Sequence, residues 1–183
     1  MPEYRRIVQK GGFYFFTIVT HQRQKLFLYP EAQSLLLKSI DHVRNYHPFE
    51  VKAFCILPDH VHFLWHMIEN DANYSMRISQ IKRHFSKQYK AWFSLSIPKN
   101  TSRQKRREVT IWQRRFWEHW IRNGRDLQRH IDYIHYNPVK HGLVNRVCYW
   151  ESSSFYDYVR AGFYDLTWGE EYQIDKKEHQ YGE

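Results

Sequence analysis

The segment Cys55–Met67, with the sequence CILPDHVHFLWHM, places histidines inside an apolar run. Side chains alternate between the two faces of a β-strand, so residues at even spacing share one face. After a turn at Pro58 and Asp59, one face would hold the apolar residues Val61, Phe63, Trp65 and Met67. The opposite face would hold His60, His62, Leu64 and His66. The segment therefore predicts a buried strand with one apolar face and one face that carries imidazoles.

Residue patterns on either side of this strand predict the other elements of a single domain. Aromatic and β-branched runs predict strands at 13–20, 49–58 and 116–122, in addition to 60–67. Apolar residues at helical spacing predict helices at 30–46, 75–93 and 125–137. The last helix is expected to end at Asn137, because Pro138 follows it. The order β-α-β-β-α-β with a further helix predicts an α+β fold of the ferredoxin-like type.

Composition and charge narrow the possible functions. The chain has 183 residues, 42% of them hydrophobic, and a formal net charge of +9, which together indicate a folded basic protein with a polyanionic partner. Two cysteines are too few for a disulfide framework, and we find neither a signal peptide nor an apolar run of about 18 residues that would span a membrane. We therefore expect a cytoplasmic protein. Residues 1–145 are expected to form the domain, and 146–183 an extension that packs on it and frays at its end.

His60 and His62 are candidate metal ligands. They would lie roughly 6–7 Å apart along a strand, so neutral imidazoles on one face could converge on one divalent ion. Histidines in a strand are more often structural, and the pair alone leaves both interpretations open.

The segment His130–Val144, HIDYIHYNPVKHGLV, adds a second group of polar residues. Tyr133 and Asn137 are i, i+4 neighbours, so one face of the helix would offer a phenol and an amide oxygen together. The amide oxygen could be a third, hard ligand to an ion that the two histidines hold. Tyr133 and Tyr136 could equally be half-buried aromatics of an ordinary amphipathic helix, and the spacing does not decide between these interpretations.

Two long segments carry a resemblance to a known family. LPDHVHFLW at 57–65 and TIWQRRFWEHWIRNGRDLQRHIDYIHYNPVKHGLV at 110–144 resemble the transposase-like proteins associated with repetitive extragenic palindromes. These proteins are relatives of the single-strand tyrosine transposases of insertion sequences, in the His-hydrophobic-His superfamily. The resemblance extends from the N-terminal EYRR to about Gly169, and it implies the same ferredoxin-like fold.

The resemblance implies a role for each candidate residue. His60 and His62 match the metal-binding pair of the family, with Val61 as the hydrophobic residue between them. Tyr133 matches the nucleophile. Asn137 matches the third metal ligand, a position that glutamine occupies in the insertion-sequence relatives.

The implied reaction is DNA transesterification. Mg²⁺ or Mn²⁺ would be the cofactor, since an amide ligand and a phosphate favour hard ions. Tyr133 would attack phosphorus, leaving a 5′-phosphotyrosine and a free 3′-hydroxyl. The resemblance also implies a single-stranded DNA substrate with a palindromic hairpin, and a protein that acts as a monomer. A free tyrosine has a pKa of about 10, and the sequence does not name a base for it.

DNA contacts would come from basic and aromatic side chains, because Lys and Arg neutralise phosphates and aromatics stack on unpaired bases. The candidate contacts are Arg5, Arg6, Lys82, Arg83, Lys87, Arg114 and Arg115, with the cationic segment 103–107 as a further one. A solvated basic surface is the alternative interpretation. His66 would lie about 13 Å from His62, too far to share its ion easily, and we expect it to be structural or to face DNA.

Two rival functions remain. Ferredoxin-like folds also serve as RNA-recognition modules, and the aromatic strand 13–20 would suit a non-catalytic nucleic-acid-binding module. A metal-dependent nuclease that activates water would leave no protein–DNA adduct. The binding module does not explain His60, His62 and Tyr133 together.

Overall fold

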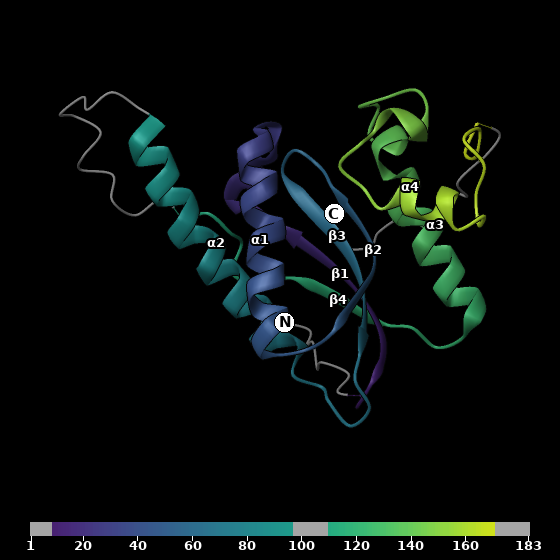
Figure 1. Cartoon of the computed structure of the whole chain (residues 1–183), viewed down its shortest axis with the longest axis horizontal. Coiled ribbons are helices and arrows are strands. Elements are labelled where there is room, and N and C mark those ends of the chain that lie inside the picture. Colours follow the sequence, from purple (N-terminus) through teal and green to yellow (C-terminus); the bar gives the residue numbers. More distant parts are fainter. Residues whose placement is uncertain (1–8, 97–109, 171–183) are drawn as a thin grey trace, which may run out of the picture.

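A computed structural model describes residues 9–96 and 110–170 of the chain. The strands and α-helices of this part are β1 (Gly12–Val19), α1 (Pro30–Tyr46), β2 (Glu50–Ile56), β3 (His60–Met67), α2 (Tyr74–Ser96), β4 (Trp117–Trp120), α3 (Gly124–Lys140) and α4 (Phe155–Arg160). The strands form one antiparallel sheet in the order β2-β3-β1-β4. Helices α1 and α2 lie on one side of the sheet, and α3 and α4 lie on the other (Figure 1). The predicted α+β fold and its βαββαβ order are confirmed.

Side chains of β3 alternate between the two faces of the sheet, so successive residues pack into two different cores. β3 pairs with β2 on one side and with β1 on the other, so it lies inside the sheet. One face packs into a core that the sheet shares with α1 and α2, and its members on β3 are Val61, Phe63, Trp65 and Met67. Leu36 of α1 and Phe85 of α2 belong to the same core. The apolar face predicted for this strand is confirmed.

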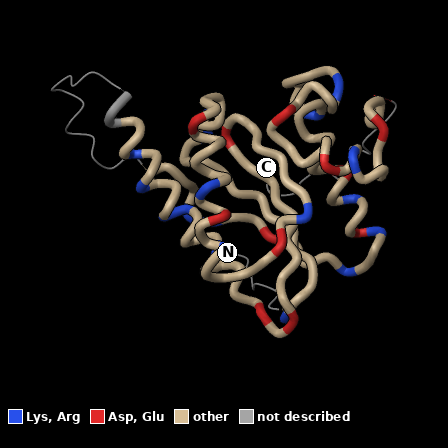
Figure 2. Tube along the Cα trace, viewed as in Figure 1, with Lys and Arg blue, Asp and Glu red and all other residues tan. Residues whose placement is uncertain are grey.

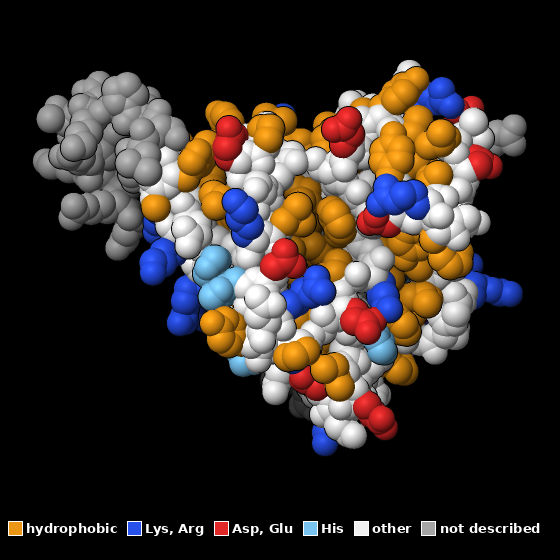
Figure 3. Space-filling view, viewed as in Figure 1, with side chains coloured by type: hydrophobic (Ala, Val, Ile, Leu, Met, Phe, Trp, Pro, Cys, Tyr) orange, Lys and Arg blue, Asp and Glu red, His pale blue; other side chains and the backbone are white. Residues whose placement is uncertain are grey.

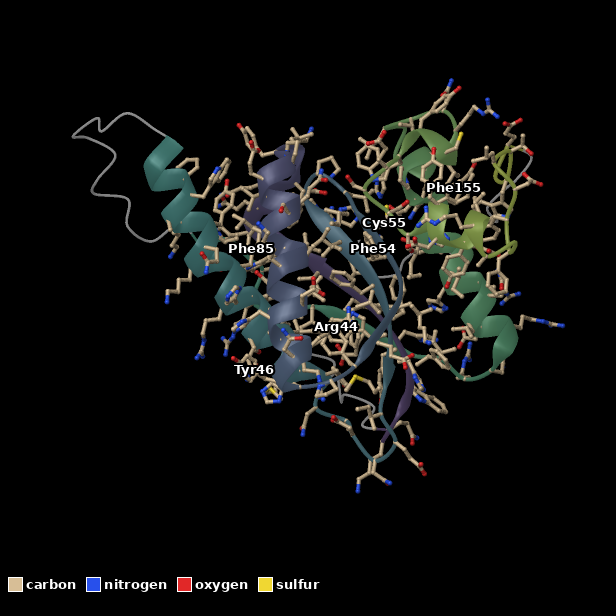
Figure 4. All side chains as sticks on the ribbon, viewed as in Figure 1. Arg44, Tyr46, Phe54, Cys55, Phe85 and Phe155 are labelled. Carbon is tan, nitrogen blue, oxygen red and sulfur yellow. The ribbon has the colours of Figure 1, made fainter. Side chains whose placement is uncertain are left out.

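The opposite face of the sheet carries a second core. Phe15 of β1 and Leu64 of β3 pack there with Ile131 and Ile134 of α3 and with Phe155 of α4. In Figure 4, Phe155 and Phe85 lie on opposite sides of the sheet. Across residues 9–96 and 110–170, no helix is both long and apolar enough to cross a membrane.

The segment between α3 and α4 covers the outer edge of β2. The backbone N–H of Ile56 donates to the carbonyl of Ser152 at 2.8 Å, and the N–H of Ser154 donates to the carbonyl of Phe54 at 3.0 Å. An exposed strand edge is a template for pairing with other chains, so these bonds protect β2. The boundary between a domain at 1–145 and an extension stays a prediction, and the end expected to fray, 171–183, lies outside the described residues.

Helix α3 does not end at Asn137, which corrects the prediction from the sequence. Pro138 lies inside the helix, and α3 continues to Lys140. Proline removes one N–H donor, but the next turn still closes, since the N–H of His141 donates to the carbonyl of Asn137 at 3.0 Å. The helix ends before Gly142, whose φ of +64° is the left-handed conformation typical of the residue after a helix.

Arg77 is an interior residue, although a strongly basic helix suggests a surface position for it. Its side chain is 3% exposed and donates to a carboxylate oxygen of Asp71 at 3.1 Å. It also donates to the carbonyls of His47 and Pro48, at 3.1 Å each. Arg77 therefore joins the loop after α1 to the start of α2. The hydrogen bonds from Arg77 to the Asp71 carboxylate hold the pKa of Asp71 below its ordinary value.

Replacing Arg77 with glutamine should lower the free energy of unfolding at neutral pH by about 3 kcal/mol, because buried carbonyls and a carboxylate lose their cation. The folded-state pKa of Asp71 lies below its value of 3.8 in the unfolded chain, so its contribution is complete above that pH and disappears as the pH falls through the lowered value. The deficit of Arg77→Gln should therefore shrink in acid.

Urea unfolding at neutral and acidic pH measures both effects. Lys87→Gln, at an exposed position of the same helix, is the matched control and should change the free energy of unfolding by less than about 0.5 kcal/mol. Equal losses in the two variants would contradict a structural role for Arg77.

Candidate active site

His60 and His62 lie side by side on the face of β3 that meets α3. The centroids of their rings are 4.9 Å apart, and the exposed fractions of the two residues are 2% and 0%. Leu64, two residues further on, packs in the core beneath α3. The alternation predicted from the sequence therefore places both imidazoles in the interior, where each needs a hydrogen-bond partner.

A neighbouring side chain orients each ring. Nδ1 of His60 lies 2.6 Å from Oδ1 of Asp59, and Nδ1 of His62 lies 3.0 Å from Oγ1 of Thr17, its partner across the sheet on β1. In the tautomer in which Nδ1 donates, Nε2 keeps its lone pair for a ligand. Nε2 of His60 is buried and has no hydrogen-bond partner among the described residues.

Asp59 is itself held in place. Arg23 donates to its second carboxylate oxygen at 3.2 Å, and the hydroxyl of Thr20 donates to its backbone carbonyl at 2.8 Å. Burial alone would raise the pKa of Asp59, but the hydrogen bonds from His60 and Arg23 hold it below its ordinary value. The carboxylate is therefore charged at neutral pH and favours the His60 tautomer with the proton on Nδ1.

Helix α3 and the residue that follows it contact both histidines. The ring centroid of Tyr133 is 5.3 Å from that of His62, and the ring centroid of His141, just after the helix, is 5.3 Å from that of His60. Asn137 lies one turn after Tyr133 and one turn before His141, and it is wholly buried. Asn137 therefore lies on the stretch of α3 between the residue that contacts His62 and the residue that contacts His60. The structure thus brings three of the residues that the sequence singled out, His60, His62 and Tyr133, into one group.

Phe15 of β1 packs between the sheet and α3. Its side chain is wholly buried, and its ring centroid lies 5.4 Å from that of His62 and 5.9 Å from that of Tyr133. It also lies 5.0 Å from the ring centroid of His130, which precedes Tyr133 by one turn of α3. One aromatic side chain therefore sets the spacing between the histidine pair and the helix.

Lys140, in the last turn of α3, also contacts the phenol. Its Nζ donates to the hydroxyl oxygen of Tyr133 at 3.1 Å. The sequence did not predict this contact, because Pro138 indicated a helix end at Asn137. The signal that could have found it is the i, i+7 spacing of Tyr133 and Lys140, which places two residues on one helical face.

A hydrogen-bonded cluster of His119, Asp126 and His130 joins the start of α3 to β4. Nε2 of His119 lies 2.9 Å from the carboxylate of Asp126, and Nδ1 of His130 donates to the backbone carbonyl of Asp126 at 2.8 Å. In the part of the chain that the structure describes, this is the only group of three His, Cys, Asp or Glu residues whose ligand atoms lie within 4.8 Å of one another. Sequence reasoning missed it because His119 and His130 belong to different elements.

The charges of this cluster favour hydrogen bonding over a metal ion. The backbone N–H and the guanidinium of Arg122 both donate to the Asp126 carboxylate at 3.1 Å. Burial would raise the pKa of Asp126, but these donors and His119 hold it well below its ordinary value. Burial lowers the pKa of His130 to about 4, so this ring is neutral at neutral pH. A cation would have to displace the guanidinium, whereas the existing contacts satisfy the carboxylate.

The predicted DNA contacts on α2 lie across the sheet from the histidines. Lys82, Arg83 and Lys87 belong to α2, whereas His60 and His62 face α3 on the other side (Figure 1). Lys and Arg residues follow α2 in the trace of Figure 2, and basic side chains project beside it in Figure 3. The structure therefore does not bring these residues into direct contact with the histidine pair.

A second basic segment adjoins α2. Nζ of Lys82 donates to the backbone carbonyl of Gln113 at 3.0 Å, and the next two residues, Arg114 and Arg115, are exposed. Arg5, Arg6 and the segment 103–107 lie outside the described residues. His66 is partly exposed and stacks on Phe13 with ring centroids 4.6 Å apart, away from the histidine pair.

Comparison with known proteins identifies the family. A family model described as "Transposase IS200 like" matches residues 10–137, a range that includes His60, His62, Tyr133 and Asn137. The chain belongs to this family. It is 48% identical to a protein of Haemophilus influenzae named "Putative REP-associated tyrosine transposase", over 92% of its own length and 94% of the relative's. It is 39% identical to a REP-associated tyrosine transposase of Escherichia coli, over 92% and 91% of the two chains.

A solved structure supports the same grouping. The structure of a REP-associated tyrosine transposase bound to a REP hairpin aligns with 96% of each chain at a TM-score of 0.77 and 36% identity. REP stands for repetitive extragenic palindrome. The family recognised from the sequence motifs, and the fold it implied, are therefore confirmed.

In this IS200-like transposase, Phe15→Ala should lower the free energy of unfolding by about 3–5 kcal/mol, because the cavity would open at the contact between two layers. Phe13→Ala, at a half-buried position of the same strand, is the control and should cost about 1 kcal/mol. Chemical denaturation of both variants measures the difference. Similar small losses would mean that α3 does not depend on the Phe15 ring.

Proposed function

We propose that this IS200-like transposase cuts and rejoins single-stranded DNA through a covalent bond to Tyr133. The observation that carries the proposal is the contact of the Tyr133 ring with His62, beside the buried Nε2 of His60 that has no partner among residues 9–96 and 110–170. A phenol next to two imidazoles suits attack on a phosphate that a cation holds. The relative bound to a REP hairpin supports DNA with a palindromic hairpin as the substrate class.

The reaction balances as a transesterification. The hydroxyl oxygen of Tyr133 forms a bond to phosphorus, and the bond from phosphorus to the 3′-oxygen breaks. The phenol proton passes to water, and the released 3′-oxygen takes a proton from water. The products are a 5′-phosphotyrosine and a free 3′-hydroxyl. Because the new bond keeps the phosphodiester energy, a 3′-hydroxyl can rejoin the DNA without a nucleoside triphosphate.

We propose that His60, His62 and Asn137 hold Mg²⁺ or Mn²⁺. A buried Nε2 of His60 without a hydrogen-bond partner among the described residues is costly, and a cation would satisfy it. Two imidazoles and an amide oxygen suit a divalent ion, and a phosphate ligand favours the harder ions. When bound, the ion would offset the negative charge that builds on the phosphate oxygens. Asp59 and Thr17 keep the two rings oriented for this role.

We propose that the basic surface made by α2 and the segment 113–115 binds the DNA backbone. Its members are Lys82, Arg83, Lys87, Arg114 and Arg115. We propose Arg5 and Arg6, which lie outside the described residues, as further DNA contacts. Exposure of the arginines and the bond from Lys82 to Gln113 support one continuous surface. Binding through phosphates would weaken steeply as the salt concentration rises.

We further propose that the protein acts as a monomer in the cytoplasm. Support for the monomer comes from the contact between His62 and Tyr133 of the same chain, since one chain then holds the whole candidate site. Residues 146–183 would serve as an extension of the catalytic domain. Its segment Ser152–Ser154, bonded to the edge of β2, supports a structural role for the extension.

Incubation with end-labelled single-stranded hairpin DNA and Mn²⁺ should give a covalent protein–DNA adduct on the 3′-side fragment, seen on a denaturing gel. Tyr133→Phe should abolish the adduct, because the attacking oxygen is missing. Tyr136→Phe, which removes a hydroxyl from a half-buried tyrosine of the same helix, should retain it.

Two other results would each contradict tyrosine transesterification. Cleavage without an adduct that survives in Tyr133→Phe would identify a nuclease that activates water. Binding of several hairpins without cleavage in either metal would identify a non-catalytic nucleic-acid-binding module.

Asp59→Asn should weaken Mn²⁺ binding about tenfold in calorimetric titrations without DNA. The asparagine amide can donate to Nδ1 of His60, which moves the ring proton to Nε2 and blocks that atom as a ligand. Asp41→Asn removes a carboxylate from an exposed position of α1 and should leave Mn²⁺ affinity unchanged. An unchanged affinity in Asp59→Asn as well would argue against His60 as a metal ligand.

A further inference from the structure

Lys140 contacts the atom that reacts in the proposed mechanism. Its Nζ donates to the hydroxyl oxygen of Tyr133 at 3.1 Å and lies 4.8 Å from the centroid of the phenol ring. Tyr133 is 3% exposed and Lys140 is half-buried, so the contact is partly shielded from water. A hydrogen bond from a charged donor is stronger in such surroundings than in bulk water.

The contact depends on the last turn of α3. Lys140 follows Tyr133 by seven residues, so the two side chains share one face of the helix. Pro138 lies between them without ending the helix. A cation at the C-terminal end of a helix is also favourable without any catalytic role, because it interacts with the carbonyl end of the helix dipole. An experiment must therefore separate these two reasons for a lysine at this position.

We propose that Lys140 is a catalytic residue that stabilises the negative charge on the hydroxyl oxygen of Tyr133. The inference rests on the proposed function, since charge develops on this oxygen only when it attacks phosphorus or leaves it. During attack, the phenol proton goes to water, and the ammonium group keeps its protons and its hydrogen bond. During rejoining, the bond from phosphorus to Tyr133 breaks, and its electron pair remains on the oxygen beside the ammonium. Donors already aimed at such an oxygen contribute strongly to catalysis.

The test compares Lys140→Gln, Lys140→Met and Lys140→Arg with wild-type protein, using the full chain. Lys38→Gln, at an exposed position of α1, is the matched control. Three quantities are measured for each variant: the Kd for hairpin DNA, the single-turnover rate of adduct formation at saturating DNA, and the rate of rejoining. We expect the glutamine and methionine variants to lose about a hundredfold in both rates with an unchanged Kd. The arginine variant should recover most of both rates, because it keeps a charged donor.

A second measurement tests the contact without any activity. If Lys140 bonds to Tyr133 in solution, Lys140→Gln should lower the melting temperature less in a Tyr133→Phe background than in wild-type protein. Equal shifts in the two backgrounds would count against the contact itself and so against the inference.

The kinetic outcomes separate the possible roles of Lys140. A weaker Kd with unchanged saturated rates in Lys140→Gln would make Lys140 a phosphate-binding residue and overturn the inference. Unchanged rates and Kd would leave only the helix-end role and also overturn it. A wild-type protein that forms no adduct would instead refute the proposed function, whereas failure of the inference alone leaves the wild-type adduct intact.

Discussion

The ring of Phe15 is the contact on which the candidate site depends. It is wholly buried, and it touches His62 on the sheet side and Tyr133 and His130 on the helix side. The distance between the tyrosine and the histidine pair therefore follows from the packing of one apolar side chain. Interiors are close-packed and resist small displacements, so this packing helps to hold the two polar groups at a fixed spacing.

The strand β3 serves both cores because its side chains alternate. Its odd-numbered residues pack under α1 and α2, and that apolar burial holds the strand in the middle of the sheet. Its even-numbered residues are then free to be polar, provided that each finds a partner. Thr17 lies directly across the sheet from His62, and Asp59 lies next to His60 in the turn. The sheet register and the turn thus orient the two imidazoles before any ligand binds.

Local periodicity in the sequence predicts the four strands, helices α1 and α2, most of α3 and the two faces of β3, but it did not predict α4. It also placed Tyr133 and Asn137 on one helical face, and the family resemblance linked them to the histidines. What it could not give were properties that depend on distant contacts. Arg77 belongs to a basic helix, where an arginine is expected at the surface. It is buried because Asp71 and the carbonyls of His47 and Pro48 accept its hydrogen bonds. The link between His119 and His130 likewise exists only after α3 packs on β4.

The position at which α3 ends decides which residues reach the candidate site. A proline is usually a sign that a helix stops, and the residue before it tends to leave the helical conformation. Here Gly142, not Pro138, provides the left-handed residue that a helix end needs, and the helix gains one more turn. Without that turn, Asn137 would lose its helical backbone, and neither Lys140 nor His141 would reach the site. The extra turn therefore brings a cation to Tyr133 and an imidazole to His60, two groups that no shorter helix could supply.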